Sequence, residues 1–230
     1  RLYGEIRRRF KGFPSLLDGA QAILLSWRGH ARSSLDGFST AIEELRASDP
    51  LGQLPWTVSM GLIAACSVED GGRAEEFRRI LENLAGPSRM LFGSEMDRAT
   101  AHHHALAGHD RKAFSLLRES VEEAASRGKL ALALGSLVDL ARLGAADEAL
   151  DRMERLVDEP DPSWKLFSTE LAATRAQVDG RVDDLVRAGE DLARGGFDLR
   201  AAECLALASS EAHRGRRSRD AYGHELVSRA

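Results

Sequence analysis

The sequence predicts an all-α protein, a solenoid of about six helical hairpins that pack one against the next. Three observations lead to this fold class. Apolar residues recur at steps of three and four along most of the chain, as in Leu117, Val121 and Ala124, which is the spacing of an amphipathic helix. Runs that alternate β-branched or aromatic residues with polar ones, which would indicate strands, are absent. Short glycine-containing turns return at a regular interval that accommodates two helices.

The interval is measured between corresponding residues near the start of the helix that follows each turn. These residues stand at positions 35, 77, 114, 150, 185 and 222, so the intervals are 42, 37, 36, 35 and 37 residues. A helical hairpin of this length cannot bury its apolar face alone and therefore stacks on its neighbours. Each turn contains a glycine, which can adopt the left-handed conformation that ends many helices. The turns are Arg28–His30, Asp70–Gly72, Ala107–Asp110, Leu143–Ala145, Val178–Gly180 and Arg214–Arg216.

Each element follows from these periods in chain order. Residues 1–13 are expected to be the tail of a truncated preceding hairpin, with its second helix at 2–11. The longer joints at 48–55, 86–92 and 158–163 hold five of the six prolines, and proline disrupts helix interiors. We expect residues 1–230 to form one domain, cut from a longer chain because the sequence begins with Arg. The predicted helix pairs are 15–29 with 34–47, 56–70 with 74–85, 94–107 with 111–127, 129–143 with 147–158, 163–178 with 181–194, and 197–214 with 218–229.

The composition excludes several classes of protein. A hydrophobic share of 43% over 230 residues supplies a sizeable core and argues against disorder. A formal net charge of −4 argues against a dedicated nucleic-acid binder, since phosphate affinity comes from Lys and Arg. Neither a signal peptide nor a membrane-spanning stretch is present in the sequence. Cys66 and Cys204 lie far apart in apolar stretches, which predicts two buried thiols in a reducing, cytoplasmic environment.

Two segments carry a resemblance to known families. Gly144–Leu150 resembles the turn of a tetratricopeptide-type (TPR) repeat, although Asp184 stands where that family has Ala and its full Trp-Leu-Gly-Tyr set is missing. Ala201–Ala221 looks like the last repeats of the large LuxR-type, MalT-like regulators of bacteria, which combine an ATPase module, a TPR-like superhelix and a C-terminal helix-turn-helix. The resemblance implies a right-handed superhelix of TPR-like hairpins. It implies no cofactor in this fragment, and it places any ATP in a missing upstream module.

Motifs for catalysis, phosphate binding or metal binding are not found. The nearest approach to a P-loop ends at Gly128-Lys129, but Glu123 replaces its first glycine and Leu130 its Ser or Thr. His102–His104 are adjacent on a helix and point about 100° apart, so they cannot chelate one ion. The basic run Arg214–Arg219 is interpreted as a solvated turn. We therefore predict neither catalytic nor metal-ligating residues.

In TPR-like arrays the first helix of each pair lines a concave groove, and the resemblance implies which positions face it. The polar set there is Glu95, Arg98 and His102 in an otherwise apolar surface, a pattern typical of a ligand site. The alternative is that a tightly wound superhelix closes this surface as core. Replacing Arg98 is expected to weaken effector binding with stability nearly unchanged. The candidate ligand-binding residues are Ile23, Trp27, Val58, Glu95, Arg98, His102 and Gln177.

Two function classes follow from the resemblance and the pattern. The first is a non-catalytic sensor and interaction module of a LuxR-type transcriptional regulator that binds a small-molecule, peptide or protein effector in the groove. The second is a stand-alone TPR-type scaffold that binds a partner peptide or helix. An enzyme is disfavoured because no convergent catalytic set is present. The expected partners are the effector and other modules of the parent chain, with a homodimer as one further assembly and no contact with nucleic acid or membrane.

Overall fold

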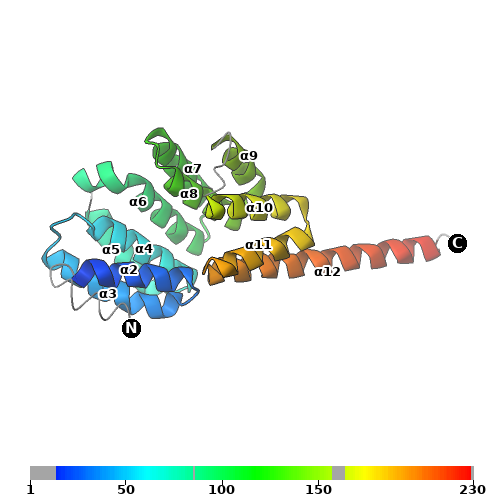
Figure 1. Ribbon diagram of the computed structural model, residues 1–230, viewed down its shortest axis with the longest axis horizontal. Coiled ribbons are helices and arrows are strands. Elements are labelled where there is room, and N and C mark those ends of the chain that lie inside the picture. The colour runs from blue at the N-terminus through cyan, green and yellow to red at the C-terminus, as the bar shows by residue number, and fades with distance from the viewer. Residues whose placement is uncertain (1–13, 85, 157–163, 229–230) are drawn as a thin grey trace. The chain divides into compact units, whose positions relative to one another are not determined.

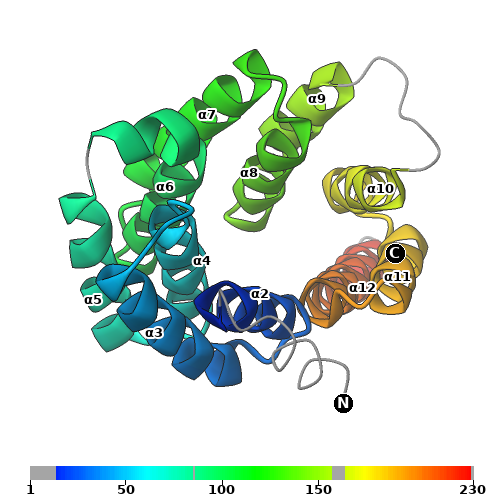
Figure 2. The same ribbon diagram turned by 60° about the vertical axis from the view of Figure 1, so that its left-hand side comes forward.

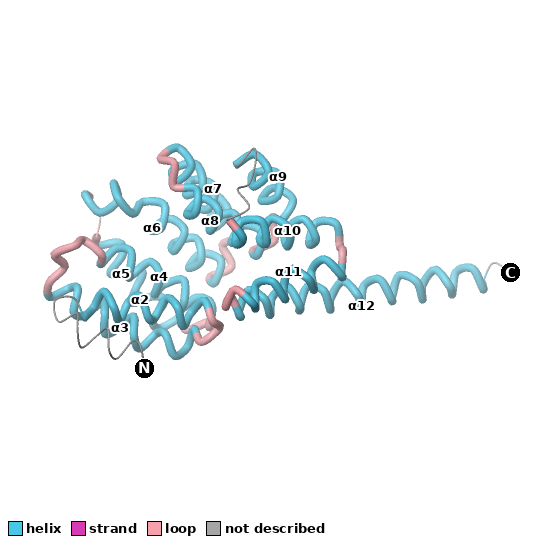
Figure 3. Tube along the Cα trace, viewed as in Figure 1, coloured by secondary structure: helices cyan, strands magenta, loops and turns pink. Residues whose placement is uncertain are grey.

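The computed structural model describes residues 14–84, 86–156 and 164–228. They form helices joined by short turns, and this part of the chain contains no strand (Figure 1; Figure 3). The all-α class is therefore confirmed, and each predicted helix from 15–29 to 181–194 corresponds to one helix of the structure. The helices are α2 (Pro14–Trp27), α3 (Ala31–Ala47), α4 (Leu54–Ser67), α5 (Gly71–Asn83), α6 (Pro87–Leu106), α7 (Asp110–Ser126), α8 (Leu130–Arg142), α9 (Ala146–Leu156), α10 (Lys165–Asp179), α11 (Val182–Arg194) and α12 (Asp198–Ser228).

The chain divides into two compact units. Unit 1 is Arg1–Leu143 and contains α2 to α8, and unit 2 is Gly144–Ala230 and contains α9 to α12. In both units consecutive helices pack against each other, as in a helical solenoid. Within unit 1, Figure 2 shows α2 and α4 on the inner side of α3 and α5, and α8 on the inner side of α7. Three helices predicted to come first in their pairs, α2, α4 and α8, thus lie on the inner side of a neighbour in unit 1.

The core of unit 1 is built from large apolar side chains over a helical glycine. Phe38 and Phe77 are fully buried between α3, α4 and α5. A Cβ placed on Gly61 of α4 would lie 3.2 Å from the Phe77 ring and 3.4 Å from the Cβ of Phe38. Gly61 therefore serves close packing. A Cβ on Gly19 of α2 would meet its nearest neighbour, Thr57, at an ordinary 3.6 Å, so close packing does not require that glycine.

Unit 2 has smaller apolar residues in its core. Ala173 of α10, Ala188 and Leu192 of α11, and Cys204 of α12 pack together. A Cβ on Gly189 would lie 3.2 Å from the backbone oxygen of Ala201, so α11 and α12 approach closely at this point. The apolar periodicity of these helices thus corresponds to a real shared interface.

Both cysteines are free and buried, as the sequence predicted. Burial raises the pKa of the Cys66 thiol to about 12. It also raises the pKa of Cys204, against an opposing effect of Arg200. Both side chains therefore remain neutral thiols that pack as small apolar groups.

The glycine turns follow the prediction at four of six places. Glycines in the left-handed region end helices at Gly29, Gly108, Gly144 and Gly180. In the turn at Asp70–Gly72 the left-handed residue is instead Glu69, with φ 56°. The Asp70 side chain accepts a hydrogen bond from the backbone N–H of Arg73, so the next helix begins directly at Gly71.

The prediction of a turn at Arg214–Arg216 is wrong. A single helix, α12, continues through it from Asp198 to Ser228 (Figure 1). One glycine costs a helix interior only about 1 kcal/mol, and this segment contains no proline that would force an end. The predicted hairpin of 197–214 with 218–229 is therefore one helix.

The joint predicted at 86–92 is mostly helical. Helix α6 begins at Pro87, which fits the first helical turn, and it is interrupted at Phe92, with φ −123° and ψ 20°. Just before the kink, Lys129 Nζ donates a hydrogen bond to the carbonyl of Leu91 at 2.7 Å, and Arg127 donates one to the carbonyl of Met90. The helix predicted at 2–11 and the joint at 158–163 lie outside the described residues.

The two helical glycines give a matched test of packing. Gly19→Ala should raise the free energy of unfolding by up to about 1 kcal/mol, because helix propensity improves where space is available. Gly61→Ala should give no gain or a loss, because its Cβ presses on the buried Phe77 ring. Urea unfolding of both variants measures the difference. Equal stabilisation by both substitutions would contradict the close packing at Gly61.

Candidate functional site

The predicted polar set lies on one face of α6. Glu95, Arg98 and His102 are spaced by three and four residues, so their side chains point in similar directions. Glu95 and His102 are buried, and the Arg98 side chain is 22% exposed. This face of α6 meets α8, and the partner that it finds there is Asp139.

Asp139 is the centre of a buried charge cluster in unit 1. Its side chain is 1% exposed. Arg98 Nε lies 2.6 Å and His102 Nε2 lies 2.7 Å from the same oxygen, Oδ2. Arg142 Nη1 donates to Oδ1 at 3.1 Å. One carboxylate thus links α6 to α8 and also accepts a hydrogen bond from the last turn of its own helix.

The cluster keeps Asp139 ionised. Burial by itself raises the pKa of a carboxyl group, because the charged form loses its hydration. Arg98, His102 and Arg142 oppose burial and together hold the pKa of Asp139 well below its ordinary value. A permanent negative charge therefore sits between these side chains.

A glycine on α8 makes room for Arg98. Gly135 lies one turn before Asp139, and a Cβ there would be 3.1 Å from Arg98 Nη1 and 3.3 Å from its Cζ. The guanidinium therefore lies against the bare backbone of α8. A Cβ at position 135 would force the guanidinium to shift by a few tenths of an ångström.

Arg98 uses one of its three nitrogens in this cluster. Only Nε bonds to Asp139, and in the described part of the chain no hydrogen bond engages Nη1 or Nη2. Neither terminal nitrogen is sealed from solvent. A guanidinium fixed in this way offers two parallel N–H donors, the geometry that suits a carboxylate.

More polar groups are buried next to the cluster. The Ser120 hydroxyl of α7 donates to the carbonyl of Ser94 at 2.8 Å and lies 2.7 Å from the Ser136 hydroxyl of α8. Because its single proton goes to Ser94, Ser136 must donate the second bond. Ser94 Oγ donates to Glu95 Oε2 at 2.8 Å. Of thirteen buried polar or charged residues in the described chain, seven lie on α6, α7 and α8, which marks this region as different from the apolar core of α3 to α5.

The other predicted site residues lie elsewhere. Ile23 and Val58 belong to the buried core of unit 1, so they do not line an open surface as the register had implied. Trp27 is 50% exposed at the end of α2. Gln177 is half-buried on α10, in unit 2. Of the seven candidates, the structure joins Arg98 and His102 through a shared partner.

Sequence reasoning missed Asp139, Arg142 and Gly135. A signal was present, because Asp139 is the one acidic residue of an otherwise apolar helix, Leu130–Arg142. A charge in the middle of such a helix requires a buried cationic partner. The expectation that Arg98 is neutral for stability also needs correction, because this side chain balances a buried carboxylate.

His103, His104 and His109 form a separate group where α6 ends and α7 begins. His103 Nε2 lies 3.6 Å from Glu75 Oε2, and the rings of His104 and His109 are 5.9 Å apart. Burial lowers the pKa of both His103 and His104, assisted by the nearby cations Arg78 and Lys112 respectively. Across the described residues no three His, Cys, Asp or Glu side chains are grouped so that they could hold a metal ion.

Comparison of the chain with protein-family models, curated proteins and solved structures finds no match. Among the described helices, none combines the length and apolarity needed to cross a membrane.

Two Arg–Asp pairs with the same separation test the cost of burial. Arg98–Asp139 and Arg73–Asp36 are both 2.6 Å apart, but the Asp36 side chain is 80% exposed. Asp139→Asn should destabilise the protein by about 3–5 kcal/mol, because it leaves the partly buried Arg98 and Arg142 without their counter-charge. Asp36→Asn should cost at most about 1 kcal/mol, because an exposed pair is screened by solvent. Chemical unfolding compares the variants, and similar losses would mean that Asp139 is not electrostatically buried.

Proposed function

We propose that this chain is a non-catalytic effector-binding and protein-interaction module whose effector contacts unit 1 at Arg98. The observation that carries the proposal is a guanidinium with two accessible, unused donors, fixed by Asp139 and given space by Gly135. Such a group is prepared to bind a carboxylate, since little side-chain entropy is left to lose. The effector class that fits is a small molecule or peptide with a carboxylate group.

The non-catalytic part of the proposal rests on the chemistry of the cluster. An Asp–His pair is also part of catalytic triads, where the histidine's second nitrogen activates a nucleophile. In the described residues no hydroxyl or thiol hydrogen-bonds to Nδ1 of His102. Asp139 itself is a weak base, because its pKa is held well below the ordinary value. The cluster is therefore better suited to binding than to proton transfer.

We further propose that the parent protein is a LuxR-type regulator and that this chain forms its helical-repeat sensor. Support comes from the resemblance of residues 144–150 and 201–221 to TPR-like and MalT-like repeats, and from the stacked helices. Sequencing the reading frame on both sides tests it. An ATPase module upstream and a helix-turn-helix downstream are expected, and a short frame with neither would leave the stand-alone scaffold.

Arg98→Lys separates ligand binding from stability. Lysine keeps the positive charge beside Asp139 but lacks the planar pair of N–H donors, so the fold should survive while carboxylate binding is lost. Thermal melts with a panel of small carboxylates and acidic peptides provide the measurement, because a ligand that binds the folded state raises its melting temperature. Arg73→Lys is the matched control and should respond as wild type does. A ligand that stabilises wild type and Arg98→Lys equally would show that its site lies elsewhere.

A further inference from the structure

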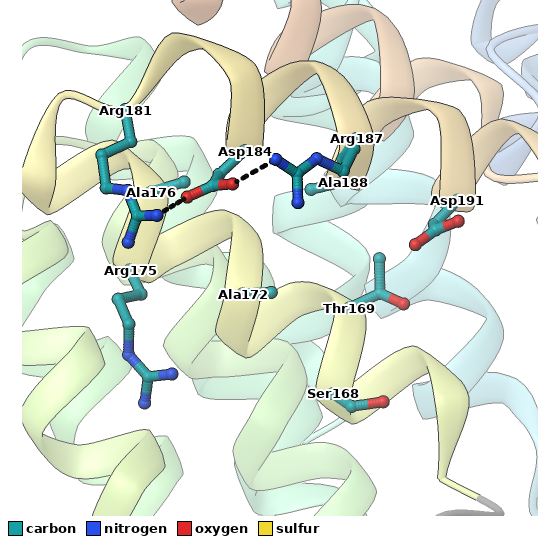
Figure 4. Close-up of a pocket in the computed structure, with 10 residues that line it drawn as sticks. All are labelled: Ser168, Thr169, Ala172, Arg175, Ala176, Arg181, Asp184, Arg187, Ala188 and Asp191. Atoms are coloured by element: carbon teal, nitrogen blue, oxygen red, sulfur yellow. Dashed lines mark ion pairs between the residues drawn. The ribbon is translucent and has the colours of Figure 1, made fainter.

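Unit 2 contains an open groove between α10 and α11 that is separate from the cluster of unit 1. It has a volume of about 430 Å³, and a smaller hollow of about 260 Å³ adjoins it around Arg181, Asp184 and Arg187. Figure 4 shows side chains of both helices around the groove. Three alanines, Ala172, Ala176 and Ala188, are among the lining residues. Because these side chains are short, the space between the helices is left unfilled.

Three arginines give the groove its chemical character. The side chains of Arg175, Arg181 and Arg187 are 48%, 62% and 74% exposed. Arg181 and Arg187 share the single carboxylate of Asp184, at 2.7 and 3.2 Å (Figure 4). Arg175 bonds instead to Glu154 of α9 at 2.7 Å. One lining carboxylate thus serves two guanidinium groups.

Each of the three arginines uses one terminal nitrogen in these pairs. Of the other carboxylates, Asp191 lines the groove and pairs with Arg194 on its own helix, and Asp183 lines the adjoining hollow. Since a guanidinium carries five N–H donors, most of the donors of these three arginines form no hydrogen bond within the described residues. The groove itself, lined by three arginines and two aspartates, therefore has an excess of N–H donors and one more positive than negative charge, and a ligand with several carboxylates complements both.

We propose that this groove binds an acidic segment of a partner protein. The lining part of α10 runs from Ser168 to Ala176, about 12 Å of helix at 1.5 Å per residue. An extended chain rises about 3.3 Å per residue, so a few residues fill this length. A single small anion would reach only one end of it. The carboxylates of the segment bond to Arg175, Arg181 and Arg187, and its backbone lies over the alanines.

The test uses the whole chain and a fluorescently labelled octapeptide rich in Asp and Glu. Its counterpart, with Asn and Gln at the same positions, is the neutral probe. Fluorescence anisotropy should show binding of the acidic peptide, no binding of the neutral one, and weaker binding at higher salt. The variant Arg175→Gln/Arg181→Gln/Arg187→Gln should weaken binding at least about tenfold, or about 1.4 kcal/mol.

The control removes three other exposed arginines, Arg79→Gln/Arg155→Gln/Arg214→Gln, each of which forms a pair within its own helix. It changes the net charge equally and should leave binding within about twofold of wild type. Equal losses in both triple variants would overturn the proposal in favour of nonspecific attraction. So would binding of the neutral peptide, or no binding of the acidic one.

A second variant tests the shape of the groove without removing charge. Ala172→Leu fills part of the groove and keeps all three arginines, and its exposed position should preserve the fold. It should weaken binding of the acidic peptide at least about tenfold, or about 1.4 kcal/mol.

Inorganic phosphate at matched ionic strength provides the last comparison. If phosphate displaces the peptide with an affinity as high as the peptide's own, the groove is a small-anion site and the proposal is wrong.

Discussion

The carboxylate of Asp139 must be neutralised before α6 and α8 can pack. An ionised carboxylate that leaves water loses several kcal/mol of hydration, and only nearby cations and hydrogen bonds recover it. Arg98 and His102 approach one oxygen from α6, while Arg142 approaches the other from the same helix as Asp139. The glycine at position 135 fits this requirement, since a Cβ there would crowd the guanidinium of Arg98. The register of α6 against α8 is thus set by charge as well as by shape.

Stacked helices do not need such a cluster. The neighbouring helices α3, α4 and α5 pack around Phe38, Phe77 and Gly61, mainly through apolar contacts and close approach, and their ion pair Arg73–Asp36 lies at the surface. Apolar residues of similar volume often stabilise a fold as well as a buried ion pair does, or better. The concentration of buried polar residues on α6, α7 and α8 therefore suggests a purpose other than stability. The accessible side of Arg98 is the part of the cluster that a ligand could use.

The sequence was most informative where a single local rule decides the structure. Helix positions followed from apolar periodicity, and glycines such as Gly108 and Gly180 ended helices because left-handed backbone favours them. It was least informative where the sequence allows two local structures. Gly215 can end a helix or continue one, and it continues α12. Helix α6 is interrupted at Phe92, beside the pair Gly93-Ser94, a kind of site at which helices kink, and Arg127 and Lys129 bond to the carbonyls just before it.

The same limit explains what was found of the candidate site. Arg98 and His102 could be assigned to one helix face from their spacing, but their shared partner lies 41 and 37 residues away. Periodicity identifies buried positions without saying which of them meet. Ile23 and Val58 were placed on a groove for this reason, although the packing of unit 1 encloses them. A buried charge is the exception, because it cannot remain unpaired. The single acidic residue of α8 therefore carried information about a distant contact that no apolar residue of the same helix could carry.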